Sequence, residues 1–310
     1  MRVVSFNVNG IRAAARRGFA DWLAASQADV VALQEVRARV PDVPAGVFSP
    51  YHLSYDPGEL AGRNGVALLT RQPPSRVFRW SPGIDSASNP WADEGRLIGV
   101  DLADAPLTVL SVYVPKGGLP LQIAPVDGGR ERHTPEKSDA RYQRKMAFLA
   151  RLATELDALF VEAETAGRHL LVLGDFNIAH GPADLRNWRS NLASEGFLPG
   201  ERAWMDALVG PAPSAELLVG RRIVAPGLDW PSASHPLVDV VRALNPGQDG
   251  PYSWWSWFGR AFENDVGWRI DYHLASPGLV DLATKVWVDR ATSGAERVSD
   301  HAAVVADYSL

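Results

Sequence analysis

The sequence predicts one α/β domain with packed β-sheets. Short apolar runs rich in β-branched residues alternate with longer segments whose apolar residues recur at helical spacing. The chain has 310 residues, which is enough to build one large core. No shift in composition and no repeat of about 20 to 50 residues divides it. We therefore expect residues 1–310 to form a single domain.

The strands are predicted from apolar runs bounded by polar or turn-forming residues. Each run is short and buried in character, as expected of strands that lie inside a layered fold. The runs are residues 3–8, 30–33, 65–70, 97–102, 107–114, 169–173, 269–275 and 302–308.

One long helix is predicted over residues 140–164, because its apolar side chains recur every three or four residues. Ser138 or Asp139 is the expected N-cap, and Gly167 is expected to end the helix. Proline and glycine gather in the segments 117–139 and 210–236, which we interpret as long loops.

Composition places the chain among globular proteins, with 46% hydrophobic and 22% charged residues. No apolar run is long enough for a membrane span, and the N-terminus lacks the apolar core of a signal peptide. With no cysteine in the sequence, we expect a cytoplasmic protein. The net charge of -5 argues against binding a polyanion through bulk charge, but it allows a local basic surface.

Polar residues follow or begin several of the predicted strands. Singly, each is explained as a turn former or a helix cap. Together they indicate a site, because strand ends of α/β sheets tend to meet at one rim. Several carboxylates at one rim would repel one another and need a cation, and oxygen ligands suit magnesium or manganese. The residues are Asn7, Glu35, Tyr113, Asp175, Asn177, Asp271, Asp300 and His301.

The residues around these positions resemble the endonuclease/exonuclease/phosphatase superfamily. Within it, residues 184–188, Gly196-Phe197, Glu201-Arg202 and residues 267–272 are similar to exonuclease III and abasic-site endonucleases. Each matching segment is weak alone, but together they follow the order of the family along the chain. They are Ser5-Phe6-Asn7-Val8-Asn9-Gly10, Leu33-Gln34-Glu35, Gly65-Val66-Ala67-Leu68-Leu69, Tyr113-Val114-Pro115, Gly174-Asp175-Phe176-Asn177-Ile178-Ala179-His180, Gly267-Trp268-Arg269-Ile270-Asp271-Tyr272 and Ser299-Asp300-His301.

The resemblance implies a four-layer α/β sandwich, in which helices flank two packed mixed β-sheets. It also implies a catalytic site that uses Mg²⁺, with Mn²⁺ as a possible substitute. Glu35 would bind the metal, with Asn7 and Asp300 nearby. Asp175 would handle a proton of the attacking water or of the leaving group. The remaining donors to the phosphate or water would be Asn7, Tyr113, Asn177 and His301, with His301 held charged by Asp271.

The resemblance also implies a substrate: double-stranded DNA with abasic sites or blocked 3′ ends. Expected activities are abasic-site incision, 3′-to-5′ exonuclease action and 3′-end cleaning, with no obligate protein partner. Trp254, Trp268 and Ile270 would line a pocket for an extruded abasic sugar. Arg63 would enter a groove near the lesion. Arg37 and Lys116 are expected to contact phosphates. Either Trp255 or Trp257 is expected to pack in the core.

Three other interpretations remain open from the sequence. A superfamily phosphatase acting on a small or lipid phosphoester would share Glu35, Asp175, Asp271 and His301 but would not need the tryptophan pocket. A DNA-binding protein with a dead site would bind damage without cutting it. A purely structural reading would make every motif a turn.

Overall fold

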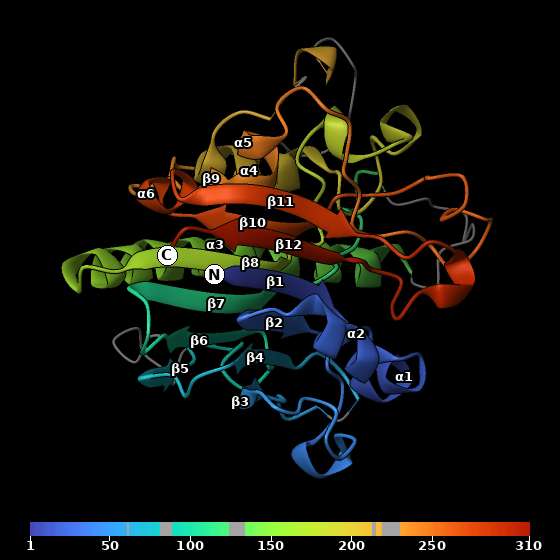
Figure 1. The fold of residues 1–310 in the computed structure, drawn as a ribbon. Helices are drawn as coiled ribbons and strands as arrows, with labels where there is room; N and C mark the ends of the chain where they lie inside the picture. Colours follow the sequence, from blue (N-terminus) through green and yellow to red (C-terminus); the bar gives the residue numbers. More distant parts are fainter. Residues whose placement is uncertain (61, 81–88, 124–133, 213–214, 219–229) are drawn as a thin grey trace.

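The computed structural model describes residues 1–310 except 61, 81–88, 124–133, 213–214 and 219–229. Two six-stranded mixed β-sheets form its centre (Figure 1). The order of the first sheet is β11-β12-β1-β2-β4-β3. Its strands are β1 (Arg2–Asn7), β2 (Val30–Gln34), β3 (His52–Asp56), β4 (Val66–Thr70), β11 (Ala283–Asp289) and β12 (Ala303–Tyr308).

The second sheet has the order β5-β6-β7-β8-β10-β9. Strand β8 lies parallel to β7 and antiparallel to β10. Its strands are β5 (Arg76–Phe78), β6 (Leu97–Asp101), β7 (Leu107–Tyr113), β8 (His169–Asp175), β9 (Val238–Asp239) and β10 (Asp271–Ala275).

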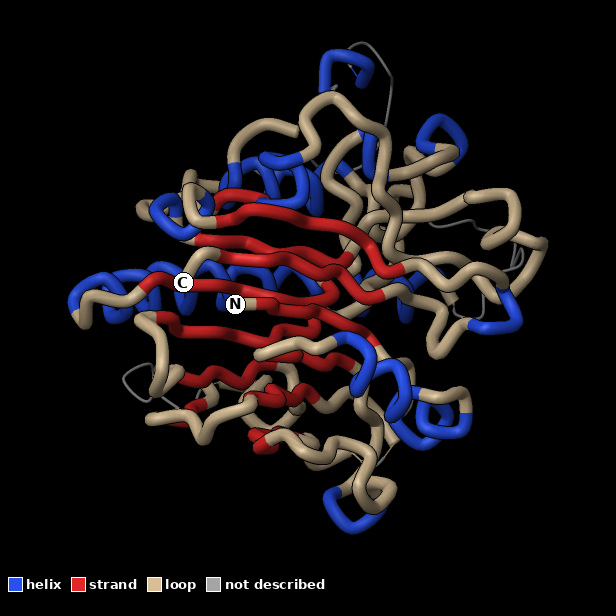
Figure 2. The backbone as a smooth tube through the Cα atoms, in the orientation of Figure 1, coloured by secondary structure: helices blue, strands red, loops and turns tan. Residues whose placement is uncertain are grey.

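Helices cover the outer faces of the sheets, which gives the four layers expected from the resemblance (Figures 1 and 2). An apolar cluster that includes Val30, Leu68, Val109 and Leu171 fills the space between the sheets. Helices α1 and α2 pack over the first sheet, while α3 and α4 pack over the second. The helices are α1 (Ile11–Arg16), α2 (Phe19–Ser26), α3 (Pro135–Thr165), α4 (Pro199–Val209), α5 (Val240–Leu244) and α6 (Pro277–Val280).

Short 3₁₀ helices occupy parts of the connections. They are η1 (Val40–Asp42), η3 (Pro182–Asp184), η4 (Trp188–Ser190), η5 (Ala215–Leu218) and η6 (Gly294–Glu296). Within the described residues, no helix combines the length and apolarity needed to cross a membrane.

All eight predicted strands are present, with ends shifted by at most two residues. Four further strands, β3, β5, β9 and β11, were not predicted. Strands β5 and β9 are too short to show a pattern, and β3 and β11 carry exposed or half-buried side chains. These four strands lie at or next to sheet edges, where one face is open and long apolar runs are not required.

The long helix begins earlier than predicted. Its N-cap is Thr134, whose hydroxyl accepts a hydrogen bond from the backbone N–H of Lys137 at 3.4 Å, so the assignment to Ser138 or Asp139 was wrong. Those two side chains instead accept hydrogen bonds from the backbone N–H groups of Leu119 and Leu121. The loop predicted at 117–139 therefore ends before Pro135, and η5 interrupts the one at 210–236. Residues 124–133, 213–214 and 219–229 of these loops lie outside the described part of the chain.

His273 is a buried polar link between the two sheets. Its Nε2 donates to the carbonyl of Val304 at 3.0 Å, and its Nδ1 lies 3.3 Å from the hydroxyl of Tyr308. Burial lowers the pKa of His273 to about 4, although the bond to Val304 opposes this shift. The imidazole is therefore neutral in the folded protein at neutral pH.

His273 makes the fold sensitive to mild acid. In the unfolded chain His273 is protonated below a pH of about 6.5, whereas in the folded protein it is protonated only as the pH approaches 4. Protonation therefore favours the unfolded state, and the free energy of unfolding falls as the pH drops through this window. This group alone should cost about 2 kcal/mol between pH 7 and pH 5. Urea unfolding at both pH values should show a smaller loss for His273→Gln than for the wild type. Equal losses of stability in His273→Gln and in the wild type would contradict the assignment of this acid sensitivity to His273.

Candidate active site

Strand pairing brings the predicted polar residues to one rim. Tyr113 and Asp271 are both paired with Asp175, one from the parallel strand β7 and the other from the antiparallel strand β10. Asn7, at the end of β1 in the first sheet, donates from Nδ2 to Asp175 Oδ2 at 2.8 Å. Asn7 thus joins the ends of β1 and β8 across the two sheets.

Asp175 is buried at the centre of this rim. The backbone N–H of Asn177 donates to its Oδ1 at 2.8 Å, and the side-chain amide of Asn177 donates to its Oδ2 at 3.3 Å. Burial, followed by the charge of Asp271, raises the pKa of Asp175 to about 7, against the opposing effect of His301. A carboxyl group with a pKa near neutrality can both accept and return a proton at physiological pH.

His301 forms a close pair with Asp271. Its Nδ1 lies 2.8 Å from Asp271 Oδ2, which also accepts a bond from the Ser253 hydroxyl at 2.6 Å. Burial alone would lower the pKa of His301, but Asp271 outweighs this effect, and with further help from Asp175 the pKa rises to about 10. His301 is therefore a charged donor, and its Nε2 lies 3.8 Å from Asp175 Oδ2.

Asp300 and Tyr113 complete the polar part of the site. Asp300 accepts from Asn9 Nδ2 at 2.7 Å and from Trp254 Nε1 at 3.1 Å. Burial opposes ionisation of Asp300, but nearby His301 and these two donors lower its pKa. Burial and then the charge of Glu35 raise the pKa of Tyr113 well above its usual value, so its hydroxyl stays protonated and able to donate.

Two buried carboxylate oxygens fit a cation site. Glu35 Oε2 and Asp271 Oδ1 receive no hydrogen bond from the described residues, although the guanidinium of Arg37 forms an ion pair with Glu35 Oε2. Asp175, Asp271 and His301 bring side-chain atoms within 4.8 Å of one another, but the charged His301 ring has no free lone pair, so the carboxylate oxygens are the ligands on offer. Oxygen ligands suit hard divalent cations.

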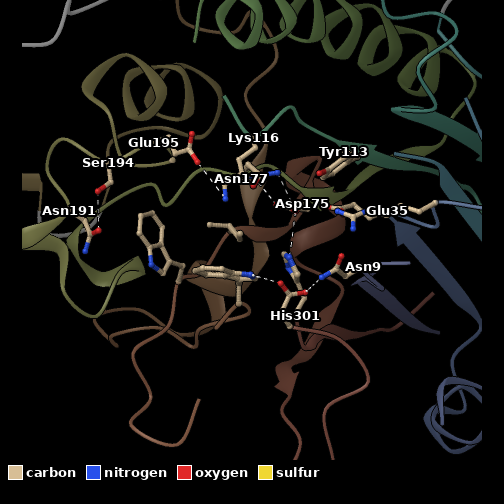
Figure 3. A pocket seen from close by; sticks show the side chains of 16 residues that line it. Asn9, Glu35, Tyr113, Lys116, Asp175, Asn177, Asn191, Ser194, Glu195 and His301 are labelled. Atoms are coloured by element: carbon tan, nitrogen blue, oxygen red, sulfur yellow. Dashed lines mark hydrogen bonds and ion pairs between the residues drawn. The ribbon is translucent and has the colours of Figure 1, made fainter. Parts of the chain in front are cut away.

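These residues open into a cavity of about 380 Å³ (Figure 3). The polar lining includes Glu35, Asp175 and His301. The apolar lining consists of Trp254, Trp268 and Ile270, and Trp254 adjoins the polar part through its hydrogen bond to Asp300. The remaining lining residues are Asn9, Arg37, Tyr113, Lys116, Asn177, Asn191, Ser194, Glu195, Gly196 and Asp300.

The structure collects most of the predicted site residues around this cavity. Asn7 and Asp271 lie fully buried beneath its surface, in contact with Asp175 and His301 respectively. Arg63 is exposed and does not belong to the described lining. Of the two alternatives for a core position, Trp255 is the core residue, which confirms the prediction, and Trp257 is 40% exposed. Its ring stacks instead with the guanidinium of Arg297.

Sequence reasoning missed Asn191, Ser194 and Glu195. They follow β8 in an irregular segment, and no spacing pattern in the sequence marks them as site residues. Asn9 was part of a quoted motif but received no role. A backbone signal is visible only in three dimensions: Asn9, Glu35 and Asn177 all have positive φ, which non-glycine residues seldom adopt and which is enriched at functional sites.

Comparison with known proteins agrees with this geometry. Residues 4–301 match the endonuclease/exonuclease/phosphatase family. The chain belongs to this family. An exodeoxyribonuclease of Bacillus subtilis is 28% identical over 98% of both chains. A DNA-(apurinic or apyrimidinic site) endonuclease of Dictyostelium discoideum is 25% identical over 91% of this chain and 64% of its own length.

Solved structures show the same fold. The structure of an AP endonuclease from Archaeoglobus fulgidus superposes with a TM-score of 0.72, at 24% identity and with complete coverage of both chains. The family assignment therefore rests on the sequence match and the fold together.

The charge of His301 should depend on Asp271. In metal-free protein, Asp271→Asn should lower the pKa of His301 from about 10 toward or below the ordinary value, because the burial penalty would then dominate. NMR titration of the His301 ring measures this directly. Ser253→Ala is the matched control, since it removes a hydrogen bond to Asp271 but keeps the carboxylate. An unchanged His301 titration in Asp271→Asn would overturn the pairing.

Proposed function

We propose that this family member is a metal-dependent DNA repair phosphodiesterase. It cuts DNA at abasic sites and acts on 3′ ends as an exonuclease and end-cleaning enzyme. The observation that carries the proposal is that Asp175 and His301, backed by buried Asp271, line the same cavity as Trp254 and Trp268. The first group suits phosphodiester hydrolysis, and the aromatic wall suits a deoxyribose that lacks its base.

Glu35 holds the metal in this proposal, with Asn7 and Asp300 completing its protein ligands. Glu35 Oε2 is buried, and its only described partner is the half-exposed guanidinium of Arg37, which supports this role. Bound Mg²⁺ or Mn²⁺ supplies Lewis-acid stabilisation of the charge on the phosphate. Displacement of Arg37 from Glu35 would leave a guanidinium beside the cavity that can contact a phosphate.

Asp175 handles the proton. Its raised pKa and its central position allow it to take a proton from the attacking water or to serve the leaving oxygen. His301 donates a charge-assisted hydrogen bond to a non-bridging phosphate oxygen, while Asn177 and Tyr113 provide neutral donors. Asp271 keeps His301 charged and fixes its ring.

The apolar wall selects the lesion. Trp254 and Trp268 meet edge to face, with ring centroids 6.3 Å apart, and Ile270 lies beside them. A sugar without a base is easily extruded and fits such a wall, whereas a normal nucleotide carries a base that must be unstacked and accommodated. The endonuclease of D. discoideum named above acts on sites of this kind.

The remaining expectations stand as proposals. Lys116 is 61% exposed at the side chain and forms an ion pair with Glu195 at 3.4 Å, which it would exchange for a DNA phosphate. Arg63, exposed outside the described lining, would contact a groove of DNA that extends beyond the cavity. We also propose that residues 1–310 work as one catalytic domain, in the cytoplasm, without an obligate protein partner.

Incision of DNA should require both a divalent metal and the side chains of Glu35 and His301. A duplex with one abasic-site analogue, incubated with Mg²⁺, should be cut on the 5′ side of the lesion. Chelator should abolish cutting, and Glu35→Ala and His301→Ala should each lower the rate by about 10²-fold or more, because charge stabilisation in the transition state is lost. Gel analysis of single-turnover reactions measures these rates.

The outcomes separate the candidate functions. Degradation of intact 3′ ends without incision at the lesion would remove the abasic-site assignment but keep the nuclease. Turnover of small phosphoesters without any DNA cleavage would favour the phosphatase alternative. Tight binding of damaged DNA without cleavage under any divalent metal would indicate a dead site.

Trp268→Ala should weaken lesion selectivity. Loss of the ring removes stacking and shape from the apolar wall, so the preference for an abasic duplex over an intact 3′ end should fall by about tenfold. Trp188→Phe is the control, because Trp188 packs in the same apolar cluster but lies outside the described lining. The ratio of kcat/KM values for the two substrates is the measurement, and an unchanged ratio would exclude Trp268 from selection.

A further inference from the structure

We propose that the buried ion pair between Lys145 and Glu201 is a positioning device that holds Asn177 and the adjoining cavity wall in the geometry needed for phosphodiester cleavage. This inference rests on the proposed function and adds two residues that do not line the cavity. Lys145 comes from α3 and Glu201 from the first turn of α4. Both are fully buried, and their Nζ and Oε1 atoms lie 2.6 Å apart.

Lys145 uses its three N–H donors on three different segments. Besides Glu201, its Nζ donates to the backbone carbonyl of Asn177 at 2.8 Å and to that of Lys116 at 3.3 Å. An ammonium group has three donors, so the described partners account for all of them. Asn177 and Lys116 both line the cavity, and they lie on the same side of it (Figure 3).

Glu201 also fixes the segment that leads into α4. Its Oε2 accepts a hydrogen bond from the backbone N–H of Leu198 at 2.9 Å, which fixes the start of α4. The residues just before Leu198 include Gly196 and Glu195, which line the cavity. One ion pair therefore connects the segments that follow β7 and β8 with the segment that leads into α4.

Glycines leave the space that this arrangement needs. A Cβ added at Gly117 would lie 2.8 Å from Cδ of Lys145, and Gly117 has a φ of +93°, which favours glycine. A Cβ added at Gly196 would lie 3.0 Å from the carbonyl oxygen of Asn177. The Asn177 carbonyl is thus confined between the Lys145 ammonium and the backbone of Gly196.

Asn177 has an uncommon backbone conformation that the ion pair helps to fix. Its φ is +51°, a left-handed value that few non-glycine residues adopt, although asparagine does so more readily than most. Its backbone N–H and side-chain amide both reach Asp175, so a shift of this residue would disturb the proton-handling carboxylate as well. A buried ion pair contributes little net stability compared with apolar side chains of similar size. Stability therefore does not explain why an ion pair lies against the cavity wall, whereas a positioning role does.

The test uses the full-length protein with the pair replaced by apolar residues, Lys145→Met together with Glu201→Leu. Replacing both partners avoids an unpaired buried charge, but it removes the hydrogen bonds to the carbonyls of Asn177 and Lys116 and to the N–H of Leu198. The thermal midpoint should therefore fall, and kinetics are compared at a temperature at which the variant is folded. With an abasic duplex and Mg²⁺, kcat should fall by about 10- to 100-fold, because catalytic groups displaced by about 1 Å lose this much activity. KM should change far less than kcat.

The decisive readout is non-additivity with Asn177. If the ion pair acts through Asn177, the double substitution should cost little further activity in an Asn177→Ala background, whereas independent effects would multiply. A folded Lys145→Met/Glu201→Leu protein with wild-type kcat, or one whose loss multiplies fully with that of Asn177→Ala, would overturn the inference. If that protein does not fold, Glu201→Gln undergoes the same two comparisons.

A second buried pair on α3 provides a matched control. Arg151 and Glu155 form an ion pair with Nη2 and Oε2 2.7 Å apart, and neither belongs to the described cavity lining. Arg151→Met with Glu155→Leu should leave kcat at the wild-type value. If the wild type does not cleave DNA, the proposed function is refuted. If the wild type and the Lys145/Glu201 variant both cleave DNA at the normal rate, only the positioning role is refuted.

Discussion

The pairing of β8 with its two neighbours is the constraint on which the site depends. Strand β8 runs parallel to β7 and antiparallel to β10, so the last residue of β7 and the first residue of β10 both lie beside Asp175. A slip of one residue in either pairing would turn Tyr113 or Asp271 to the opposite face of the sheet. Gly174 makes the close approach possible, since a Cβ there would lie 2.0 Å from the carbonyl oxygen of Val112.

This register concentrates negative charge and determines how the site manages it. Asp175 and Asp271 are buried side by side, and their repulsion is relieved in two ways. The pKa of Asp175 rises toward neutrality, and His301 takes up a proton between them. Asp271 still presents a buried oxygen without a hydrogen-bond donor among the described residues, and Glu35 Oε2 is matched by the charge of Arg37. This concentration of buried negative charge is what a bound cation would offset.

The two parts of the cavity lining have different structural origins. Trp254 and Trp268 pair through their backbones in an isolated bridge, and Trp254 also bridges to His301, so the apolar lining is attached directly to this histidine. Lys116 and Asn177, by contrast, lie in irregular segments after β7 and β8, outside the sheet. Buried polar contacts from α3 and α4, including those of Lys145 and Glu201, provide the support that a sheet gives elsewhere.

The sequence by itself determined the eight main strands, the long helix and the residues at the strand ends, because periodicity and strand-end composition are local properties. It also determined the family, because the motifs occur in order along the chain. The tertiary structure decided the rest. It placed Trp257 at the surface and Trp255 in the core, although both belong to one aromatic run, and it brought Ser194 and Glu195 to the cavity. These outcomes depend on contacts between segments far apart in the chain, and local sequence patterns carry no information about which of those segments will meet.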